Sequence, residues 1–154
     1  MKFRSTVTNL TCFNRYISEI LDVQGQVDVI FTDLQKAFDQ IDHYILLNKL
    51  DVAGLSDNLL SLFKSYLIER ELFVEYGGHR SNIYIATSGA PQGSNLGPLL
   101  FLIFFNDLSF TLNCPHLMFA DDLKLYLKIS SINDCLQLQQ NLNLVTEWCS
   151  QNLF

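Results

Sequence analysis

The sequence has few of the basic residues that most nucleic-acid-binding proteins use. Only 17% of its 154 residues are charged, and 10 lysines and arginines face 16 aspartates and glutamates, which gives a net charge of −6. Binding of nucleic acid depends on basic side chains that neutralise phosphates, so this balance argues against the chain alone being a strong nucleic-acid binder. The same balance is compatible with a site in which carboxylates hold a metal ion.

Segments that would cross a membrane or direct secretion are also missing. The longest apolar run, 96–105, is shorter than the roughly 20 residues that a membrane-spanning helix needs. Met1-Lys-Phe-Arg4 is followed by polar residues, so no signal peptide is apparent. The four cysteines have no Cys-x-x-Cys spacing, and we expect free, buried thiols. His43, His79 and His116 lie far apart, and we expect surface or packing roles rather than zinc binding.

The hydrophobic residues that are present, 49% of the chain, recur with clear helix and strand periods. In the first half of the chain they predict a helix over 13–21 stopped by Gly25, a strand over 26–33, and two helices capped by Asp42 and Asp57. A hairpin of 72–76 and 83–86 around Gly77-Gly78 follows, and then a helix over 96–108 with Ser94 as its cap. The chain continues with a second hairpin and a last helix capped by Ser131, whose apolar seam runs from Cys135 to Cys149. This order predicts an α+β fold with an antiparallel sheet backed by helices on one face.

The second hairpin carries the adjacent pair Asp121-Asp122 at its turn. Residues 123–129 alternate between apolar and polar side chains, as a half-buried strand does. Two-residue hairpin turns favour glycine and asparagine, and neighbouring carboxylates repel each other. A divalent cation would compensate for that repulsion, so the pair is a candidate metal site at the tip of a rigid hairpin.

A further carboxylate, Asp33, stands at the end of the predicted strand 26–33. If this strand pairs beside the hairpin, Asp33, Asp121 and Asp122 converge at one edge of the sheet. Mg²⁺ prefers oxygen ligands, and two such ions about 3.5–4 Å apart can stabilise an in-line phosphoryl transfer. The alternative is that each aspartate is a helix cap, a turn residue or a solvated charge.

Taken together, three segments resemble the palm motifs of reverse transcriptases from non-LTR (LINE-type, jockey-like) retrotransposons. They are Asp33-Leu-Gln-Lys-Ala-Phe-Asp39 with Asp42-His43, Gly89-Ala-Pro-Gln-Gly-Ser-Asn-Leu-Gly-Pro-Leu-Leu-Phe101, and Phe119-Ala-Asp-Asp122. Arg4-Ser-Thr-Val-Thr-Asn-Leu10 is similar to the family's lead-in to the palm. The motifs occur in the family's order, and the resemblance spans essentially the whole chain.

The resemblance implies a polymerase palm, a ferredoxin-like antiparallel sheet backed by helices, that carries out RNA-directed DNA synthesis. It implies that Asp33 and Asp121 are direct ligands of two Mg²⁺ ions, for which Mn²⁺ could substitute. The Leu34 carbonyl would add an oxygen, and Asp122 would belong to the same triad while binding metal less directly. The reaction would be attack of a primer 3′-hydroxyl on the α-phosphate of a deoxynucleoside triphosphate (dNTP).

The resemblance also assigns four nucleotide-binding residues, namely Leu34, Phe38, Gln92 and Gly93. Phe38 lies five residues after Asp33 and matches the family's aromatic gate, which leaves no room for a ribose 2′-hydroxyl; the alternative is a core phenylalanine. Gly93, like Gly89, would let the backbone approach a nucleotide closely. The Gln92 amide can donate and accept hydrogen bonds near the nucleotide or the template.

Compared with the family, the chain is expected to be truncated: a single palm fragment over 1–154, in which 1–25 is a remnant of the fingers and lead-in helix. The fingers and thumb would supply the grip on an RNA template and a DNA primer, so the fragment alone is expected to be weak or inactive. An inactive remnant that acts at most as a binding module, and an unrelated Mg²⁺-dependent phosphohydrolase, stay open. An intracellular, nuclear location is expected from the family alone.

Overall fold

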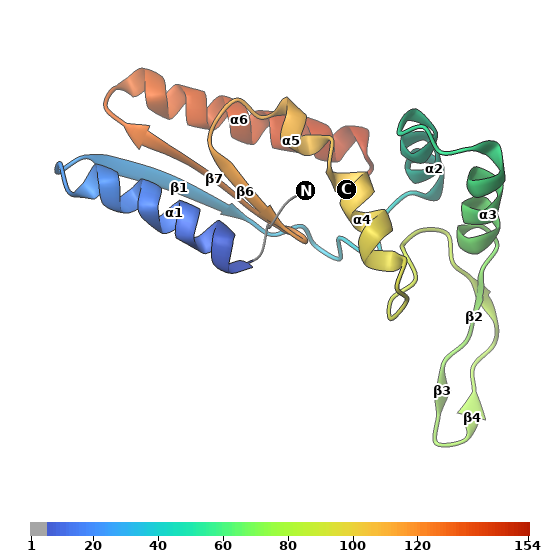
Figure 1. Cartoon of the computed structure of the whole chain (residues 1–154). Helices are drawn as coiled ribbons and strands as arrows, with labels where there is room; N and C mark the ends of the chain where they lie inside the picture. The colour runs from blue at the N-terminus through green and yellow to red at the C-terminus, as the bar shows by residue number, and fades with distance from the viewer. Residues whose placement is uncertain (1–5) are drawn as a thin grey trace. The chain divides into compact units, whose positions relative to one another are not determined.

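A computed structural model describes residues 6–154, and it divides the chain into two compact units. The first combines the chain up to Gln35 with Leu108–Cys149, and the second combines Lys36–Asp107 with Ser150–Phe154. The elements, labelled in Figure 1, are α1 Thr6–Leu21, β1 Gln26–Thr32, α2 His43–Val52, α3 Asp57–Leu67, β2 Glu71–Leu72, β3 Glu75–Tyr76, β4 His79–Arg80, β5 Tyr84–Ile85, α4 Gly97–Phe105, α5 Leu108–Thr111, β6 His116–Phe119, β7 Asp122–Ile129 and α6 Ile132–Gln151. This mixture confirms the predicted α+β class.

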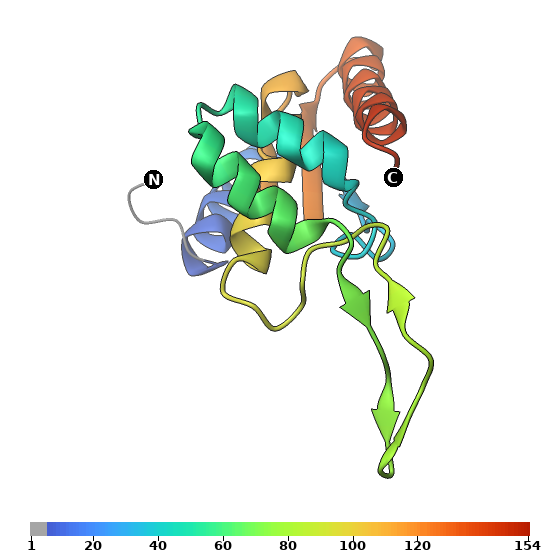
Figure 2. The ribbon, with the colours of Figure 1, turned by 90° about the vertical axis from the view of Figure 1, so that its right-hand side faces the viewer.

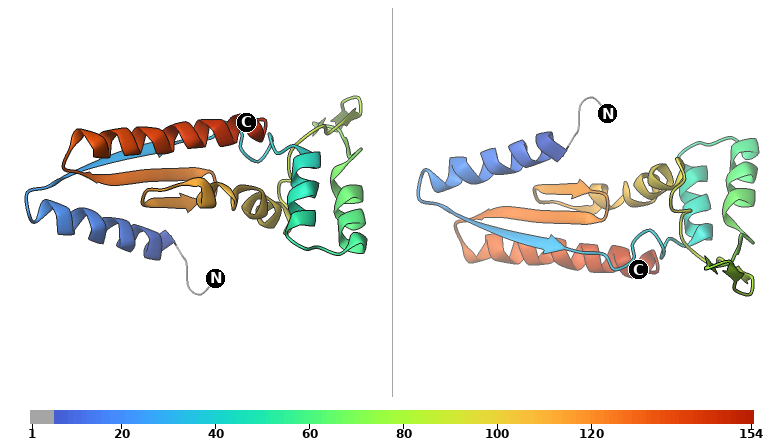
Figure 3. Two further views of the ribbon diagram at one scale, coloured as in Figure 1. Left: turned by 90° about the horizontal axis from the view of Figure 1, so that it is seen from above. Right: turned by 90° about the horizontal axis from the view of Figure 1, so that it is seen from below.

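The first unit is built on an antiparallel sheet with strand order β1-β7-β6. Leu123 and Leu125 of β7 are buried, as the alternating pattern predicts. Tyr126, expected on the polar face, is buried as well, because the rings of Phe13 and Tyr16 from α1 pack edge-on against it at 5.1 and 5.0 Å. Both views in Figure 3 place β6 and β7 between α1 and α6. Helices therefore lie on both faces of the sheet, so the expectation of helices on one face was wrong.

The end of α1 differs in one residue from the sequence-based expectation. Gly25 was the expected stop, but Gln24 adopts the left-handed backbone, with φ of 56°. The Gly25 N–H donates to the Ile20 carbonyl and the Gln24 N–H to the Leu21 carbonyl, both at 2.9 Å. This pair of bonds is the Schellman arrangement, which satisfies the last carbonyls of a helix.

In the second unit, α2 begins at the predicted cap. The Asp42 carboxylate accepts hydrogen bonds from the Tyr44 and Ile45 N–H groups, and Gly54 follows the helix with φ of 87°. The cap of α3 is Ser56, so the prediction of Asp57 was wrong by one residue. Figure 2 shows α2 and α3 side by side and the predicted hairpin around Gly77-Gly78, which pairs as two separate short ladders.

The helix expected over 96–108 is interrupted, so that α4 ends at Phe105 and α5 begins at Leu108. At the end of α4, the Lys49 ammonium donates to the Phe104 carbonyl at 2.7 Å and lies 2.9 Å from an Asp107 carboxylate oxygen. A cation at this position stabilises the last carbonyls of a helix. The start of α4 has the predicted Ser94 bond, since its Oγ accepts from the Gly97 N–H at 2.9 Å.

The last helix, α6, is capped from within its first turn. One Asp134 carboxylate oxygen accepts from the Ser130 and Ser131 N–H groups and from the Ser131 hydroxyl. Ser131 thus occupies the expected position but donates its hydroxyl rather than accepting. The predicted seam is buried at Leu138 and Val145, and it also contains the polar Asn141, whose Oδ1 accepts from the Asn113 N–H at 2.7 Å.

Residues 6–154 contain all four cysteines and the helices that bear on the membrane prediction. Within 6–154, no helix combines the length and the apolar character needed to cross a bilayer. All four cysteines are free thiols, as predicted. Cys114 is buried and burial raises the pKa of its thiol, but Cys12 is exposed on α1, so the expectation that every thiol is buried was wrong. The same range contains no zinc-type cluster around a histidine.

Candidate active site

The Asp121-Asp122 pair closes the β6–β7 hairpin, as its sequence predicts. Phe119 pairs with Asp122, which leaves Ala120 and Asp121 as the two turn residues. Ala120 has a positive φ of 50°. A positive φ at the first turn residue and not the second is the type II′ pattern of tight hairpins. The turn therefore holds the Asp121 backbone at the hairpin tip, at the cost of backbone strain in the alanine before it.

The pairing register of the sheet places the backbone of Asp33 beside this hairpin. Its predecessor Thr32 pairs with Leu123, the residue after Asp122. One further step along both antiparallel chains places the Asp33 backbone beside Asp122, which in turn pairs with Phe119. The predicted convergence of Asp33, Asp121 and Asp122 at one end of the sheet thus holds for the backbone. Leu34 follows directly in the loop after β1.

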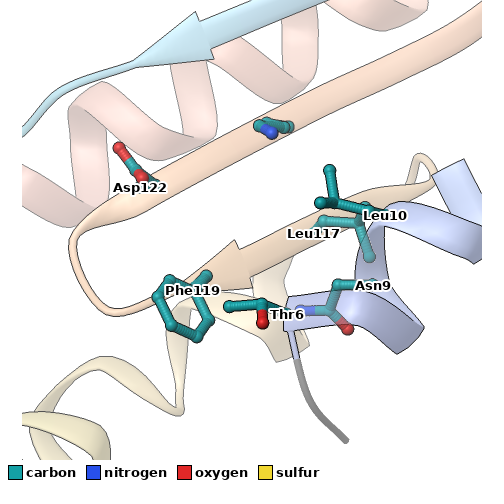
Figure 4. A pocket seen from close by; sticks show the side chains of 7 residues that line it. Thr6, Asn9, Leu10, Leu117, Phe119 and Asp122 are labelled. Carbon is teal, nitrogen blue, oxygen red and sulfur yellow. The ribbon is translucent and has the colours of Figure 1, made fainter.

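A lysine shares the sheet face that Asp122 occupies. Lys124 pairs with Phe31, and its ammonium lies 5.3 Å from the centre of the Phe31 ring and 5.7 Å from that of Phe13. Lys124 and Asp122 both line a cavity of about 150 Å³ between the start of α1 and the hairpin, together with Thr6, Asn9, Leu10, Leu117 and Phe119 (Figure 4). Asp122 therefore shares this cavity with a cation that lies beside two aromatic rings.

The exposure and the contacts of the three aspartates show how well they suit a metal ion. Asp33 and Asp122 are exposed and Asp121 is half-buried, and within residues 6–154 none of the three forms an ion pair. Their hard oxygen ligands suit Mg²⁺. However, the described residues contain no group of three or more acidic, histidine or cysteine side chains already arranged around one point. The chemistry and the register fit the ion, whereas the side chains are not gathered for it.

The second unit joins the segment after Asp33 to the glycine-rich loop. The Gly89 N–H donates to the Ile41 carbonyl at 2.8 Å, and the Ala90 N–H donates to the Phe38 carbonyl at 2.9 Å. Gly89 has φ of 87°, and a Cβ there would lie 3.0 Å from both Cα and O of Asp39. Only glycine fits this approach without displacing backbone. The loop 88–92 is therefore fixed against 38–42 by main-chain bonds.

Gln92, predicted to bind the nucleotide or template, is exposed and has one defined partner. Its Nε2 donates to the Asp39 carboxylate at 2.7 Å. Gly93 beside it has φ of 76°, and a Cβ there would meet nothing within 4 Å. The open space at Gly93 is compatible with a close approach by a ligand, as its motif predicts.

The surroundings of Phe38 are intermediate between those expected of an aromatic gate and those expected of a core phenylalanine. Its ring stacks on Phe101 of α4, with centroids 4.1 Å apart and planes at 17°, and Phe101 stacks on Phe105 at 4.7 Å. Phe101 is only 1% exposed, while Phe38 is half-buried. The ring is thus anchored on an apolar stack but is not a fully buried core residue.

The structure groups the predicted site residues into two sets. Asp33, Leu34, Asp121 and Asp122 belong to the first unit, and the nucleotide-binding residues Phe38, Gln92 and Gly93 belong to the second. Sequence reasoning did not identify the contacts of Lys124 and Asp39 with these residues. The alternation of β7 could have placed Lys124 on the face of Asp122, but partners as distant as Asp39 and Gln92 leave no local signal.

The family model for "Reverse transcriptase (RNA-dependent DNA polymerase)" matches residues 2–154. The probable RNA-directed DNA polymerase from transposon BS of Drosophila melanogaster is 29% identical over 160 residues, 96% of this chain and 17% of that protein. The RNA-directed DNA polymerase from the mobile element jockey of Drosophila funebris is 33% identical over 139 residues, 84% of this chain and 15% of that protein.

Two solved structures of telomerases have a similar fold. Apo telomerase from Candida tropicalis gives a TM-score of 0.69 at 12% identity, covering 92% of this chain and 32% of that chain. Telomerase from Candida albicans, in complex with a fragment of telomeric RNA, gives 0.64 at 14% identity, covering 91% and 28%. At this identity the likeness concerns the fold, and it agrees with the predicted polymerase palm.

Proposed function

Because the chain belongs to the reverse transcriptase family, we propose that it is the catalytic palm of an RNA-directed DNA polymerase. It spans less than a quarter of the length of the curated relatives it matches, for example 17% and 15%. The activity of those longer proteins, their substrates and their partners are therefore proposed for it and not transferred to it.

The observation that carries the proposal is the register at one end of the sheet. Asp33, Asp122 and Phe119 are brought level across three neighbouring strands, and Asp121 stands in the turn between two of them. An unrelated protein with chance Asp-Asp dipeptides would not be expected to place a third carboxylate beside them. The proposed site is thus formed from residues almost 90 positions apart, as the difference between Asp33 and Asp121 shows.

We propose that Asp33 and Asp121, with the Leu34 carbonyl and the less direct Asp122, hold two Mg²⁺ ions, or Mn²⁺ in their place. When bound, such ions stabilise charge on the attacking and leaving oxygens of a phosphoryl transfer. The protein's own part is to supply oxygen ligands on a rigid hairpin. Their partial exposure leaves the side chains free to turn toward an ion that arrives with its substrate.

The second unit would select and orient the nucleotide. The half-buried Phe38 ring, anchored on Phe101, would occupy the space beside the sugar C2′ and so disfavour a ribose. Gly93 would admit close backbone approach, and Gln92 would hydrogen-bond the nucleotide or the template. The partners proposed are therefore an RNA template, a DNA primer and a dNTP, with further protein segments supplying the basic grip. We also propose a nuclear location, on family grounds alone.

A second candidate is an inactive remnant that retains the fold. It is favoured by the absence, within residues 6–154, of a carboxylate group already arranged around one point. The two candidates differ in a direct way, because only an enzyme should lose activity when a single metal-binding oxygen is replaced.

The deciding experiment is primer extension on a poly(rA) template with an oligo(dT) primer and Mg²⁺, using this chain and the complete reading frame that contains it. Asp121→Asn should reduce extension by about 10²-fold or more, because it removes a charge from the transition-state environment. Asp22→Asn, at an exposed aspartate that follows α1, is the matched control and should leave extension unchanged. Extension by neither the chain nor the complete reading frame would favour the remnant, and extension that Asp121→Asn leaves unchanged would refute the proposed metal site.

A further inference from the structure

One peptide group in the second unit is held at both of its polar atoms. The carbonyl of Gly89 lies 3.0 Å from Nε2 of His43, and the N–H of the same peptide group, on Ala90, donates to the Phe38 carbonyl at 2.9 Å. The Gly89–Ala90 peptide plane is therefore a link between His43 at the start of α2 and the backbone of the predicted gate residue.

His43 has no role in the metal or nucleotide sites proposed above. Its side chain is only 3% exposed, so water cannot replace the bond that it makes. Since a carbonyl oxygen only accepts hydrogen bonds, Nε2 must carry the hydrogen and donate to Gly89. A buried carbonyl that loses its only strong donor is costly, which gives this contact more weight than an exposed hydrogen bond would have.

The peptide plane needs such a restraint because of the residue that precedes it. Gly89, at φ of 87°, has no side chain to limit rotation about its ψ, so the 89–90 plane can turn at little steric cost. Rotation of that plane would carry the Ala90 N–H away from the Phe38 carbonyl. The glycine that allows the loop to approach 38–39 therefore also makes the loop liable to a peptide flip.

We propose that His43 is a positioning residue that locks the Gly89–Ala90 peptide and thereby fixes the backbone of Phe38. The inference rests on the proposed function only in its last step, where a fixed Phe38 excludes ribonucleotides. His43 touches neither the nucleotide nor the metal ligands. It acts through one carbonyl, and the stack of Phe38 on Phe101 transmits that position to the ring.

Two substitutions of His43 distinguish the effect of its hydrogen bond from the effect of the volume that its ring fills. In His43→Gln the amide nitrogen can reach the position of Nε2 and donate to Gly89, whereas His43→Leu fills the buried space without a donor. Leu46→Ala is the matched control, because Leu46 is fully buried in the same helix, α2, and makes no bond to the loop. This control weakens α2 packing without removing the proposed lock.

The first readout is amide hydrogen exchange of Ala90, divided by that of Leu50, a buried residue of α2. His43→Leu should raise this ratio about tenfold, the size expected for one lost hydrogen bond, and His43→Gln should restore it. Leu46→Ala should speed both amides together and leave the ratio unchanged. An unchanged ratio in His43→Leu, or no rescue by glutamine, would overturn the proposed lock.

The second readout is the ratio of ribonucleotide to deoxynucleotide incorporation in primer extension. It should rise in His43→Leu, return in His43→Gln and stay at the wild-type value in Leu46→Ala. A confirmed lock with an unchanged sugar ratio would overturn the link to Phe38. If the wild-type protein extends no primer, the polymerase proposal fails, and the exchange ratio with the ring-proton shifts of Phe38 still decides whether His43 holds the peptide and the ring.

Discussion

Two glycines with the same backbone angle offer a direct test of how tightly the glycine-rich loop is packed. Gly89 and Gly54 both have φ of 87°, but a Cβ at Gly54 would meet nothing within 4 Å. A Cβ at Gly89 would lie 3.0 Å from Asp39 Cα and O and 3.2 Å from the Phe38 carbonyl oxygen. Replacing each by alanine therefore separates the cost of the backbone angle from the cost of crowding.

The expected losses of stability differ for this reason. The left-handed backbone costs an alanine about 1–2 kcal/mol, and about 0.4–1 kcal/mol is recovered because alanine restricts the unfolded chain. Gly54→Ala should thus destabilise by about 1 kcal/mol. Gly89→Ala has the same terms plus about 1–3 kcal/mol for forcing an atom into packed backbone, so its total should be about 2–4 kcal/mol.

Urea unfolding of the two variants and the wild type, followed by circular dichroism, measures this difference. The slope of the transition should be unchanged, so that the midpoints report stability alone. Equal losses for Gly89→Ala and Gly54→Ala would refute the contact between the loop and 38–39, because crowding would then contribute nothing. That result would also remove the structural basis for the lock proposed at His43.

Three further outcomes are expected. Ala120→Gly should raise stability by about 0.5–1 kcal/mol in thermal melts by relieving the φ of 50°, while Ala53→Gly, at φ of −72°, should lower it. The Asp134 carboxylate accepts N–H and hydroxyl hydrogen bonds from Ser130 and Ser131 that lower its pKa, so the start of α6 should loosen only as the pH falls through that lowered pKa, and an amide-shift titration should show no such step in Asp134→Asn. Phe101→Leu removes a ring stack worth about 0.5–1.5 kcal/mol, and it should weaken discrimination against ribonucleotides at Phe38 in primer extension.

Elements whose signals are local were predictable from the sequence. Asp42 capping α2 and Gly77-Gly78 turning the β3–β4 hairpin depend on residues within a few positions of one another. The strand period of β7 correctly gave Leu123 and Leu125 as core residues. Tyr126 was misassigned to the polar face because its burial comes from α1, more than a hundred positions earlier, which periodicity within one strand cannot report.

The break between α4 and α5 has a similar cause. The segment 96–108 was predicted to form one continuous helix, since neither Asn106 nor Asp107 is a strong helix breaker. The last carbonyls of α4 are instead taken by Lys49, from a helix more than 50 positions away, with Asp107 as its counter-ion. Burial lowers the pKa of Lys49 although Asp107 opposes that shift, which indicates a half-buried cation kept for its contacts at the helix end.

The residues of the candidate site could be predicted from the sequence, but the contacts among their side chains could not. Motif resemblance gave Asp33, Asp121, Asp122 and Gln92, and the pairs Thr32–Leu123 and Phe119–Asp122 agree with the expected approach of the first three backbones at one end of the sheet. It could not give the direction of each side chain. Among the described residues the carboxylates do not form a group around one point.

Asp39 determines what Gln92 can offer to a ligand. A carboxamide has two donor hydrogens and one acceptor oxygen, and Gln92 directs its nitrogen to the Asp39 carboxylate at 2.7 Å. The amide oxygen must then point away from that carboxylate, so the exposed end of Gln92 presents a fixed acceptor and one remaining N–H. Without Asp39 the amide could turn over and exchange these groups. Any hydrogen-bonding specificity of the loop therefore depends on both residues, which belong to two separate motifs, 33–39 and 89–101.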